Sequence, residues 1–247
     1  LSRSATPKEP SATIDAPAAC ASEDGFFERL GGGDFDGDGL ADIVIAAPYE
    51  CGAVFMYYGS SAGLAQVENN SDNELPSLVP DVTLKVPAES VGDRFGWKVV
   101  LGDMDGAVNA LGRRSDDLLV SATTSDRVYG FFGGSRTRFM NSEQPGTKVT
   151  LDLTAADGAI NRANFILQGR SGETGGFPSD IALADIDGDG VLDILASDEN
   201  GDHDGSGSCD NCGEIYVYEG SSTLSGLLDA PTDARASEPG NPLMHIL

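Results

Sequence analysis

Positive charge is scarce in this sequence of 247 residues. It has 15 lysine and arginine residues against 40 aspartate and glutamate residues, which gives a formal net charge of −25 at pH 7. Proteins that bind DNA, RNA or anionic membranes use clustered lysine and arginine to neutralise phosphate groups. We therefore expect no nucleic-acid partner.

Long hydrophobic runs are also missing. Apolar stretches such as Ile43–Ala47 are far shorter than the ~20 residues that a membrane-spanning helix needs, so we expect no membrane insertion. The sequence does not begin with methionine, and no apolar signal-peptide segment stands at its start. This predicts that a targeting segment has been removed or that the chain is part of a longer one.

Histidine is almost absent, which limits the enzyme chemistry open to the chain. Neither His203 nor His245 lies in a nucleophile motif such as G-x-S-x-G, and no Ser/His/Asp combination stands out. We therefore expect a protein that is not an enzyme. A sugar-acting enzyme that uses two carboxylates stays open as an alternative, because no pair can be singled out among 40 acidic residues.

Glycine and short apolar runs are what the sequence has in abundance. It has 32 glycines, and 40% of its residues are hydrophobic, as expected for many short strands joined by turns. Three segments resemble one another. Each has an apolar strand, an acidic glycine-rich loop that begins at Asp34, Asp103 or Asp185, a second apolar strand and a strand with alternating aromatic residues.

The repeats predict an all-β fold made of β-propeller blades. Extended stretches at 82–86 and 164–168 precede the second and third repeats, which gives three recognisable units of about four strands. A β-sandwich is the alternative. The predicted parts are a flexible arm rich in proline, alanine and serine (1–22), blade unit 1 (23–75), blade unit 2 (76–140), blade unit 3 (141–230) and the start of a further blade or a closing strand (231–247).

Three blades are fewer than the four to eight with which propellers close. We therefore expect an incomplete propeller, or a part of a ring built from several chains, in which further blades or subunits are the partners.

Two of the acidic loops follow the pattern D-x-D-x-D-G-x-x-D without a gap. So many carboxylates in nine residues repel one another unless a cation lies among them, and calcium accepts six to eight oxygen ligands. We expect at least two calcium ions, with main-chain carbonyls as the ligands at position seven. The predicted ligands are Asp34, Asp36, Asp38, Leu40 and Asp42 in one loop, and Asp185, Asp187, Asp189, Val191 and Asp193 in the other.

An EF-hand begins in the same way but needs glutamate at position twelve and flanking helices. Position twelve is Ile45 in one loop and Ala196 in the other, and both lie in apolar strands. The remaining alternative is an acidic turn that binds no metal.

The middle loop is a weaker candidate metal site. Asp103 and Asp105 begin the pattern, but Asp117 follows after an insertion that contains Arg113 and Arg114. The two arginines are an alternative to a metal as the partners of these carboxylates.

The three units resemble the FG-GAP repeats of the integrin α-subunit β-propeller. The resemblance rests on Phe95-Gly96, on the acidic loops and on Ala46-Ala47-Pro48 in the place of Gly-Ala-Pro. The departures are Phe26-Phe27 and Phe177-Pro178 in the place of Phe-Gly, and Ala196-Ser197-Asp198 in the last signature.

The resemblance implies a secreted or cell-surface protein in which calcium is structural and which mediates adhesion or binds a protein or glycan. A structural subunit of an extracellular assembly is the alternative. The oxidising surroundings that this implies predict two disulfides, Cys20 with Cys51 and Cys209 with Cys212, although His203 with the last two cysteines also forms a weak zinc pattern.

Overall fold

The computed structural model describes residues 14, 20, 29–49, 52–61, 80–85, 94–136, 149–152, 163–169, 176–201, 213–229 and 244–246. Every regular element of more than one turn in this part of the chain is a strand, which confirms the all-β prediction. The strands are β1 (Arg29–Gly33), β2 (Asp42–Ala47), β3 (Ala53–Tyr57), β4 (Val82–Lys85), β5 (Phe95–Gly102), β6 (Asp117–Ala122), β7 (Arg127–Phe131), β8 (Val149–Asp152), β9 (Phe165–Gln168), β10 (Ile181–Ala184), β11 (Asp193–Asp198), β12 (Glu214–Tyr218), β13 (Gly226–Asp229) and β14 (Met244–Ile246).

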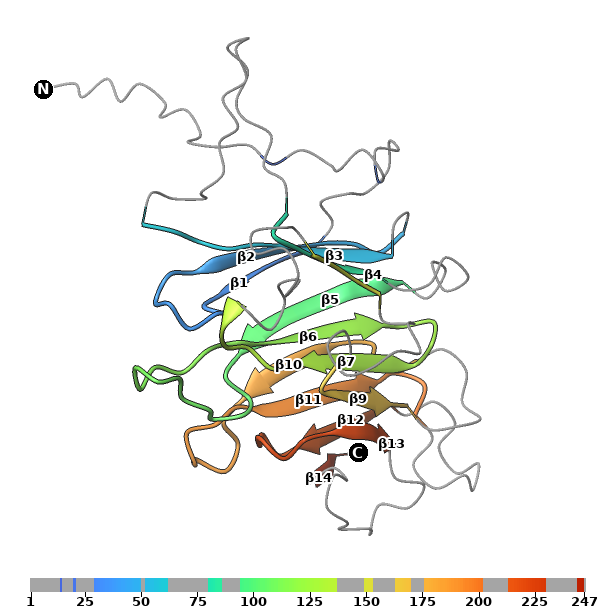
Figure 1. Ribbon diagram of the computed structural model, residues 1–247. Coiled ribbons are helices and arrows are strands. Elements are labelled where there is room, and N and C mark those ends of the chain that lie inside the picture. The colour runs from blue at the N-terminus through green and yellow to red at the C-terminus, as the bar shows by residue number, and fades with distance from the viewer. Residues whose placement is uncertain are drawn as a thin grey trace, which may run out of the picture.

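The strands form three sheets, each with four antiparallel strands. The orders are β1-β2-β3-β4, β5-β6-β7-β9 and β10-β11-β12-β14. The sheets lie one above another in chain order, and the described strands do not close into a ring (Figure 1). This arrangement has the form of propeller blades and confirms the three four-stranded units.

The outer strands belong to different units than the sequence indicated. We expected the stretch at 82–86 to begin the second unit and that at 164–168 to begin the third. Instead β4 pairs with β3, and β9 pairs with β7, so each completes the sheet before it. These stretches lie between two repeats in the sequence, and only the hydrogen bonds of the third strand decide to which sheet they belong.

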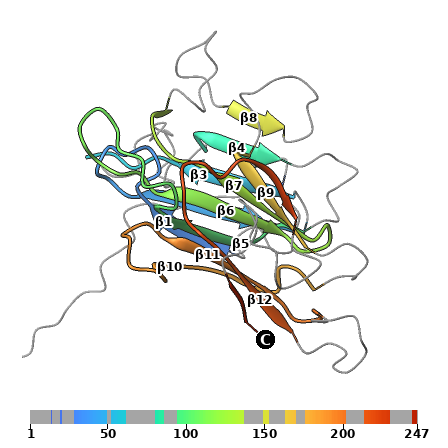
Figure 2. The same ribbon diagram turned by 90° about the horizontal axis from the view of Figure 1, so that it is seen from below.

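The C-terminal strand follows the same rule. β14 pairs with β12 and completes the third sheet of its own chain, so it does not begin a further blade. Two strands were not expected at all. β8 adds in parallel to β4, and β13 adds in parallel to β9, so that a later segment covers the outer edge of each of the first two sheets (Figure 2).

Alternating side chains join the sheets. In β6, Leu118 and Val120 pack into a core between the first and second sheets, whereas Leu119 packs into a core between the second and third. Every residue of β6 is buried, which fits a strand covered on both faces. Ile14 and Cys20 pack on the outer face of the first sheet, so two residues of the predicted arm belong to the folded body.

Candidate metal centres

The three acidic loops occupy equivalent places in the three sheets. They join β1 to β2, β5 to β6 and β10 to β11, so each connects the first two strands of its sheet. All three emerge on the same side of the stack (Figure 1). Strands flank every loop, whereas helices flank the loop of an EF-hand, so the EF-hand remains excluded.

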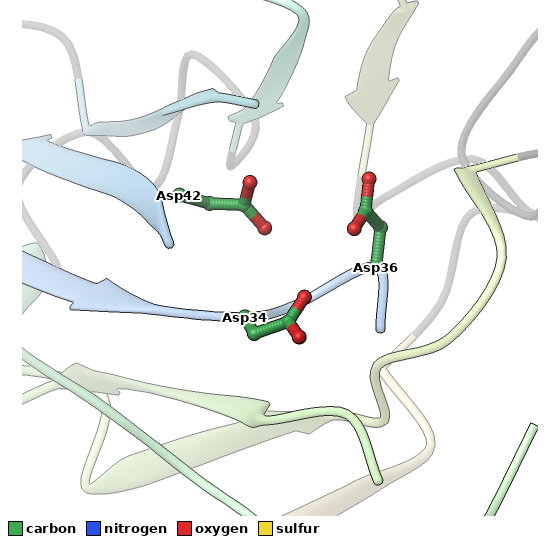
Figure 3. A group of neighbouring side chains, drawn as sticks. All are labelled: Asp34, Asp36 and Asp42. Atoms are coloured by element: carbon green, nitrogen blue, oxygen red, sulfur yellow. The ribbon is translucent and has the colours of Figure 1, made fainter. Parts of the chain in front are cut away.

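Three aspartate side chains converge in the first loop. Asp34, Asp36 and Asp42 each offer a carboxylate oxygen, and these oxygens lie within 4.8 Å of one another. Figure 3 shows the carboxylates around a common space, two from the loop and one from the start of β2. Gly37 and Gly39 have φ angles of 72° and 91°, which glycine adopts readily, and they allow the chain to turn this tightly.

Asp42 fixes the base of this loop. Its side chain is buried, and its two oxygens accept hydrogen bonds from the backbone N–H groups of Phe35 and Gly59, each at 2.8 Å. A carboxylate offers about four lone-pair sites, so these bonds leave capacity for a cation. Asp42 thus ties the loop to the end of β3 and also contributes to the acidic centre.

The third loop repeats this construction. Asp185, Asp187 and Asp193 bring carboxylate oxygens within 4.8 Å of one another. Asp193 is buried and accepts hydrogen bonds from the backbone N–H groups of Ile186, at 2.8 Å, and Gly220, at 3.0 Å. The equivalence therefore extends beyond the acidic residues to the backbone groups that hold them.

The second loop assembles the same triad despite its insertion. Oxygens of Asp103, Asp105 and Asp117 lie within 4.8 Å of one another. Asp117 is buried and accepts hydrogen bonds from the N–H groups of Met104, at 2.7 Å, and Gly133, at 2.8 Å. Asp117 thus takes the place that Asp42 has in the first loop, although it comes later in the pattern.

The inserted residues of the second loop contact both neighbouring loops. The Asn109 side chain donates a hydrogen bond to the carbonyl of Gly37 at 2.9 Å, and the Arg113 guanidinium donates one to the carbonyl of Asp38. On the other side, Arg114 Nη1 donates to the carbonyl of Gly190 at 2.6 Å. The insertion therefore joins the three loops into one continuous edge.

Arginine side chains lie beside two of the three triads. Arg114 Nη1 is 2.8 Å from Asp103 Oδ2, so one of the two arginines noted in the sequence does contact this triad. Arg136, which follows β7, forms an ion pair with Asp36 and lies 2.9 Å from Asp38 Oδ2. Sequence reasoning missed Arg136, because it lies a hundred positions from Asp36 and belongs to no motif.

Burial works against the ionisation of two of these carboxylates. Burial raises the pKa of Asp42 to about 6; the hydrogen bond from Gly59 opposes this rise, and the charge of Asp36 adds to it. Burial also raises the pKa of Asp117 to about 7, and the nearby charge of Asp105 adds to that rise. A divalent cation at the centre of a triad would favour the ionised form.

The donor set fits calcium. The three triads offer carboxylate oxygens and no sulfur or nitrogen, which suits a hard cation. Magnesium prefers fewer protein ligands and retains more water, whereas calcium accepts several carboxylates in a flexible shell. The residues present therefore fit the ion that the sequence predicts.

The predicted ligands at positions five and seven lie outside the compact triads. The second side-chain oxygen of Asp38 contacts Arg136, and the Asp189 carboxylate accepts a hydrogen bond from the N–H group of Val191 at 2.7 Å. Ligation by these two aspartates, and by the carbonyls of Leu40 and Val191, stays a prediction.

The remaining candidates contribute little here. Cys20 is buried on the outer face of the first sheet. Cys51, Cys209, Cys212 and His203 lie outside the described residues, so both predicted disulfides and the zinc alternative stay untested.

Comparison with known proteins places a repeat at the first of these loops. Residues 26–55 match the FG-GAP repeat family model, and this range holds β1, the first acidic loop, β2 and the first part of β3. The chain therefore carries an FG-GAP repeat. No curated protein matches it. In the described segments, no helix has the length and apolar character needed to cross a bilayer.

Proposed function

We propose that this chain, an FG-GAP repeat protein with three propeller-type sheets, is a calcium-stabilised recognition module that works outside the cell. It binds at least two calcium ions, in the first and third loops, and mediates adhesion or recognises a protein or glycan. The ions hold loop structure, and no catalytic step is assigned to them.

One observation carries the calcium part of this proposal. In each sheet, a buried aspartate at the start of the second strand accepts hydrogen bonds from the loop and from the residues after the third strand, and it also belongs to a carboxylate triad. In an acidic turn that binds no metal, a buried carboxylate beside two others is disfavoured by charge repulsion and by its loss of water. The same construction in three sheets supports a common ligand.

Calcium would stabilise the stack as well as each loop. The first loop is bonded to the insertion of the second, and Leu192 N–H donates to the carbonyl of Asp103 at 2.9 Å, which ties the third loop to the second. An ion that binds only the folded loops stabilises the fold by mass action. The opposite end of the sheets is then held in a fixed shape, as a recognition surface requires.

Calcium titration by calorimetry, combined with melting curves, tests the proposal. We expect binding of at least two ions and a higher melting temperature in calcium than in chelator. Asp187→Asn should remove one ion, whereas Asp180→Asn, an exposed residue that lies before β10 and outside the triads, should leave the stoichiometry unchanged. Melting curves that coincide in calcium and in excess chelator would contradict the proposal.

A further inference from the structure

A cleft of about 620 Å³ lies at the end of the sheets opposite the acidic loops. The start of β5 and the turn between β6 and β7 line one side of it, and the segment before β10 and the turn after β11 line the other. The cleft therefore lies between the second and third sheets. Its volume falls in the range of ≈300–1,000 Å³ that is typical of small-molecule sites.

Two strained backbone positions face this cleft. Arg94 and Asp126 have φ angles of 55° and 53°, and within the described residues they are the only two that have a positive φ without being glycine. Both line the cleft, one from each of the two elements of the second sheet. Side-chain-bearing residues persist in this conformation where the surrounding structure holds them, and such positions cluster at functional sites.

Aromatic rings hold the cation of the cleft in place. The Arg94 guanidinium lies over the rings of Tyr49 and Trp97, with its carbon 5.8 Å and 5.3 Å from the ring centroids. Tyr49 also contacts Trp97 edge to face at 5.7 Å. In the described part of the chain Arg94 forms no ion pair, so its N–H groups can serve a ligand.

Hydroxyl groups and carboxylates complete the lining of the cleft. Thr123 has a buried hydroxyl that finds no hydrogen-bond partner among the described residues. The half-buried Asp126 and the exposed Glu199 add carboxylates, and Ser179 adds a hydroxyl. The cleft thus combines an indole, one cation and two anions in a small space.

We propose that this cleft binds a neutral saccharide of one or two sugar rings, which gives a site and a ligand class to the recognition role proposed above and rests on it. An anionic ligand would meet Asp126 and Glu199, and a cationic ligand would meet Arg94. A neutral polyol meets neither repulsion, because each of its hydroxyl groups can donate to a carboxylate and accept from the guanidinium. The C–H groups of a sugar ring can contact Trp97 where the guanidinium groups of Arg29 and Arg94, whose carbons lie 4.7 Å and 5.3 Å from its ring centroid, leave the indole uncovered.

The chain provides its own reporter for this binding. Trp97 lines the cleft and is the single tryptophan of the protein, so its emission reports directly on what enters. A panel of neutral monosaccharides and disaccharides is titrated against the full chain in calcium, and the same panel includes sulfated sugars, uronic acids and short acidic and basic peptides. We expect a saturable change in emission with at least one neutral saccharide and none with the charged probes.

Two conservative variants separate recognition from folding. Thr123→Val and Glu199→Gln each remove one hydrogen-bonding function and should weaken saccharide binding at least tenfold while the melting temperature in calcium stays unchanged. Glu219→Gln is the matched control, because this exposed residue follows β12 at the other end of the sheets and its replacement should leave the titration unchanged.

The outcomes distinguish this inference from the calcium proposal. No response to any neutral saccharide, or a response to the charged probes alone, overturns the saccharide site and leaves calcium binding and its effect on melting as they were. Equal weakening by the control variant also overturns it. Saccharide binding with no effect of chelator on melting would support the cleft and contradict the calcium proposal.

Discussion

The stability of the metal-free protein should fall as pH rises from 5 to 7.5. Asp42 and Asp117 are buried, and their pKa values rise from 3.8 to about 6 and about 7 in the folded protein. The folded state therefore holds protons that the unfolded chain has already released. This contribution to stability is fully present below the unfolded value of 3.8 and is lost as pH rises through 6 and 7.

The two shifts set the size of the effect. One pKa unit corresponds to about 1.4 kcal/mol, so the free energy of unfolding should fall by about 4 kcal/mol between pH 5 and pH 7.5. In a protein of this size, that change lowers the melting temperature by roughly 10 °C. Calcium binds the ionised carboxylates, so its stabilising effect grows as pH rises. The difference in melting temperature between calcium and chelator should therefore widen from pH 5 to pH 7.5.

Melting curves followed by circular dichroism, recorded in chelator and in calcium at several pH values, measure this pH dependence of stability. The double variant Asp42→Asn with Asp117→Asn should flatten the pH dependence in chelator. Asp189→Asn removes one carboxylate charge from an exposed position. It should leave the pH dependence in chelator unchanged, and it therefore controls for general repulsion at a net charge of −25. A metal-free protein that melts higher at pH 7.5 than at pH 5 would refute the reasoning.

Three further predictions concern packing, competition and cross-links. Gly133→Ala should destabilise the fold by about 1–3 kcal/mol in urea unfolding, because an added Cβ would lie 2.2 Å from a backbone oxygen. Gly32→Ala is the control and should cost less, because its Cβ would come no closer than 3.4 Å to its nearest neighbour. Arg136→Met should tighten calcium binding at the first loop by about threefold to tenfold in calorimetry, because it removes a cation that competes with calcium for Asp36 and Asp38. Arg127→Met, at the far end of β7, is the control and should leave calcium binding unchanged. All four cysteines should resist thiol reagents in the unfolded, unreduced chain, and four reactive thiols would contradict both predicted disulfides.

The acidic loops could be predicted well because their structure is local. The aspartates of the first triad lie within nine residues, and the glycines between them allow the turn. In the second loop, the three aspartates that the sequence singled out lie together in spite of the insertion, since Asp117 still begins an apolar strand. The hydrogen bonds that Asp117 accepts give the reason: its position in the sheet, and not its distance along the loop, decides its role.

Other parts of the molecule could not be predicted from local patterns. Arg136 reaches the first triad from the second sheet, and no spacing rule connects it to Asp36. The cleft near Trp97 collects residues from four separate segments, none of which carries a motif. Such sites form where turns of neighbouring sheets meet, so they exist only once the sheets have stacked.

The sequence by itself determined that the chain forms strands, where its acidic loops lie, and which side chains alternate toward the two faces of each strand. These properties arise from interactions between residues that are close along the chain. Only the tertiary structure decided that β4, β9 and β14 complete the sheets before them, and that β8 and β13 cover outer edges. Each of these pairings closes a long stretch of chain at an entropic cost that depends little on its sequence. The hydrogen bonds and buried side chains at the meeting edges select the partner, and these exist only in the folded stack.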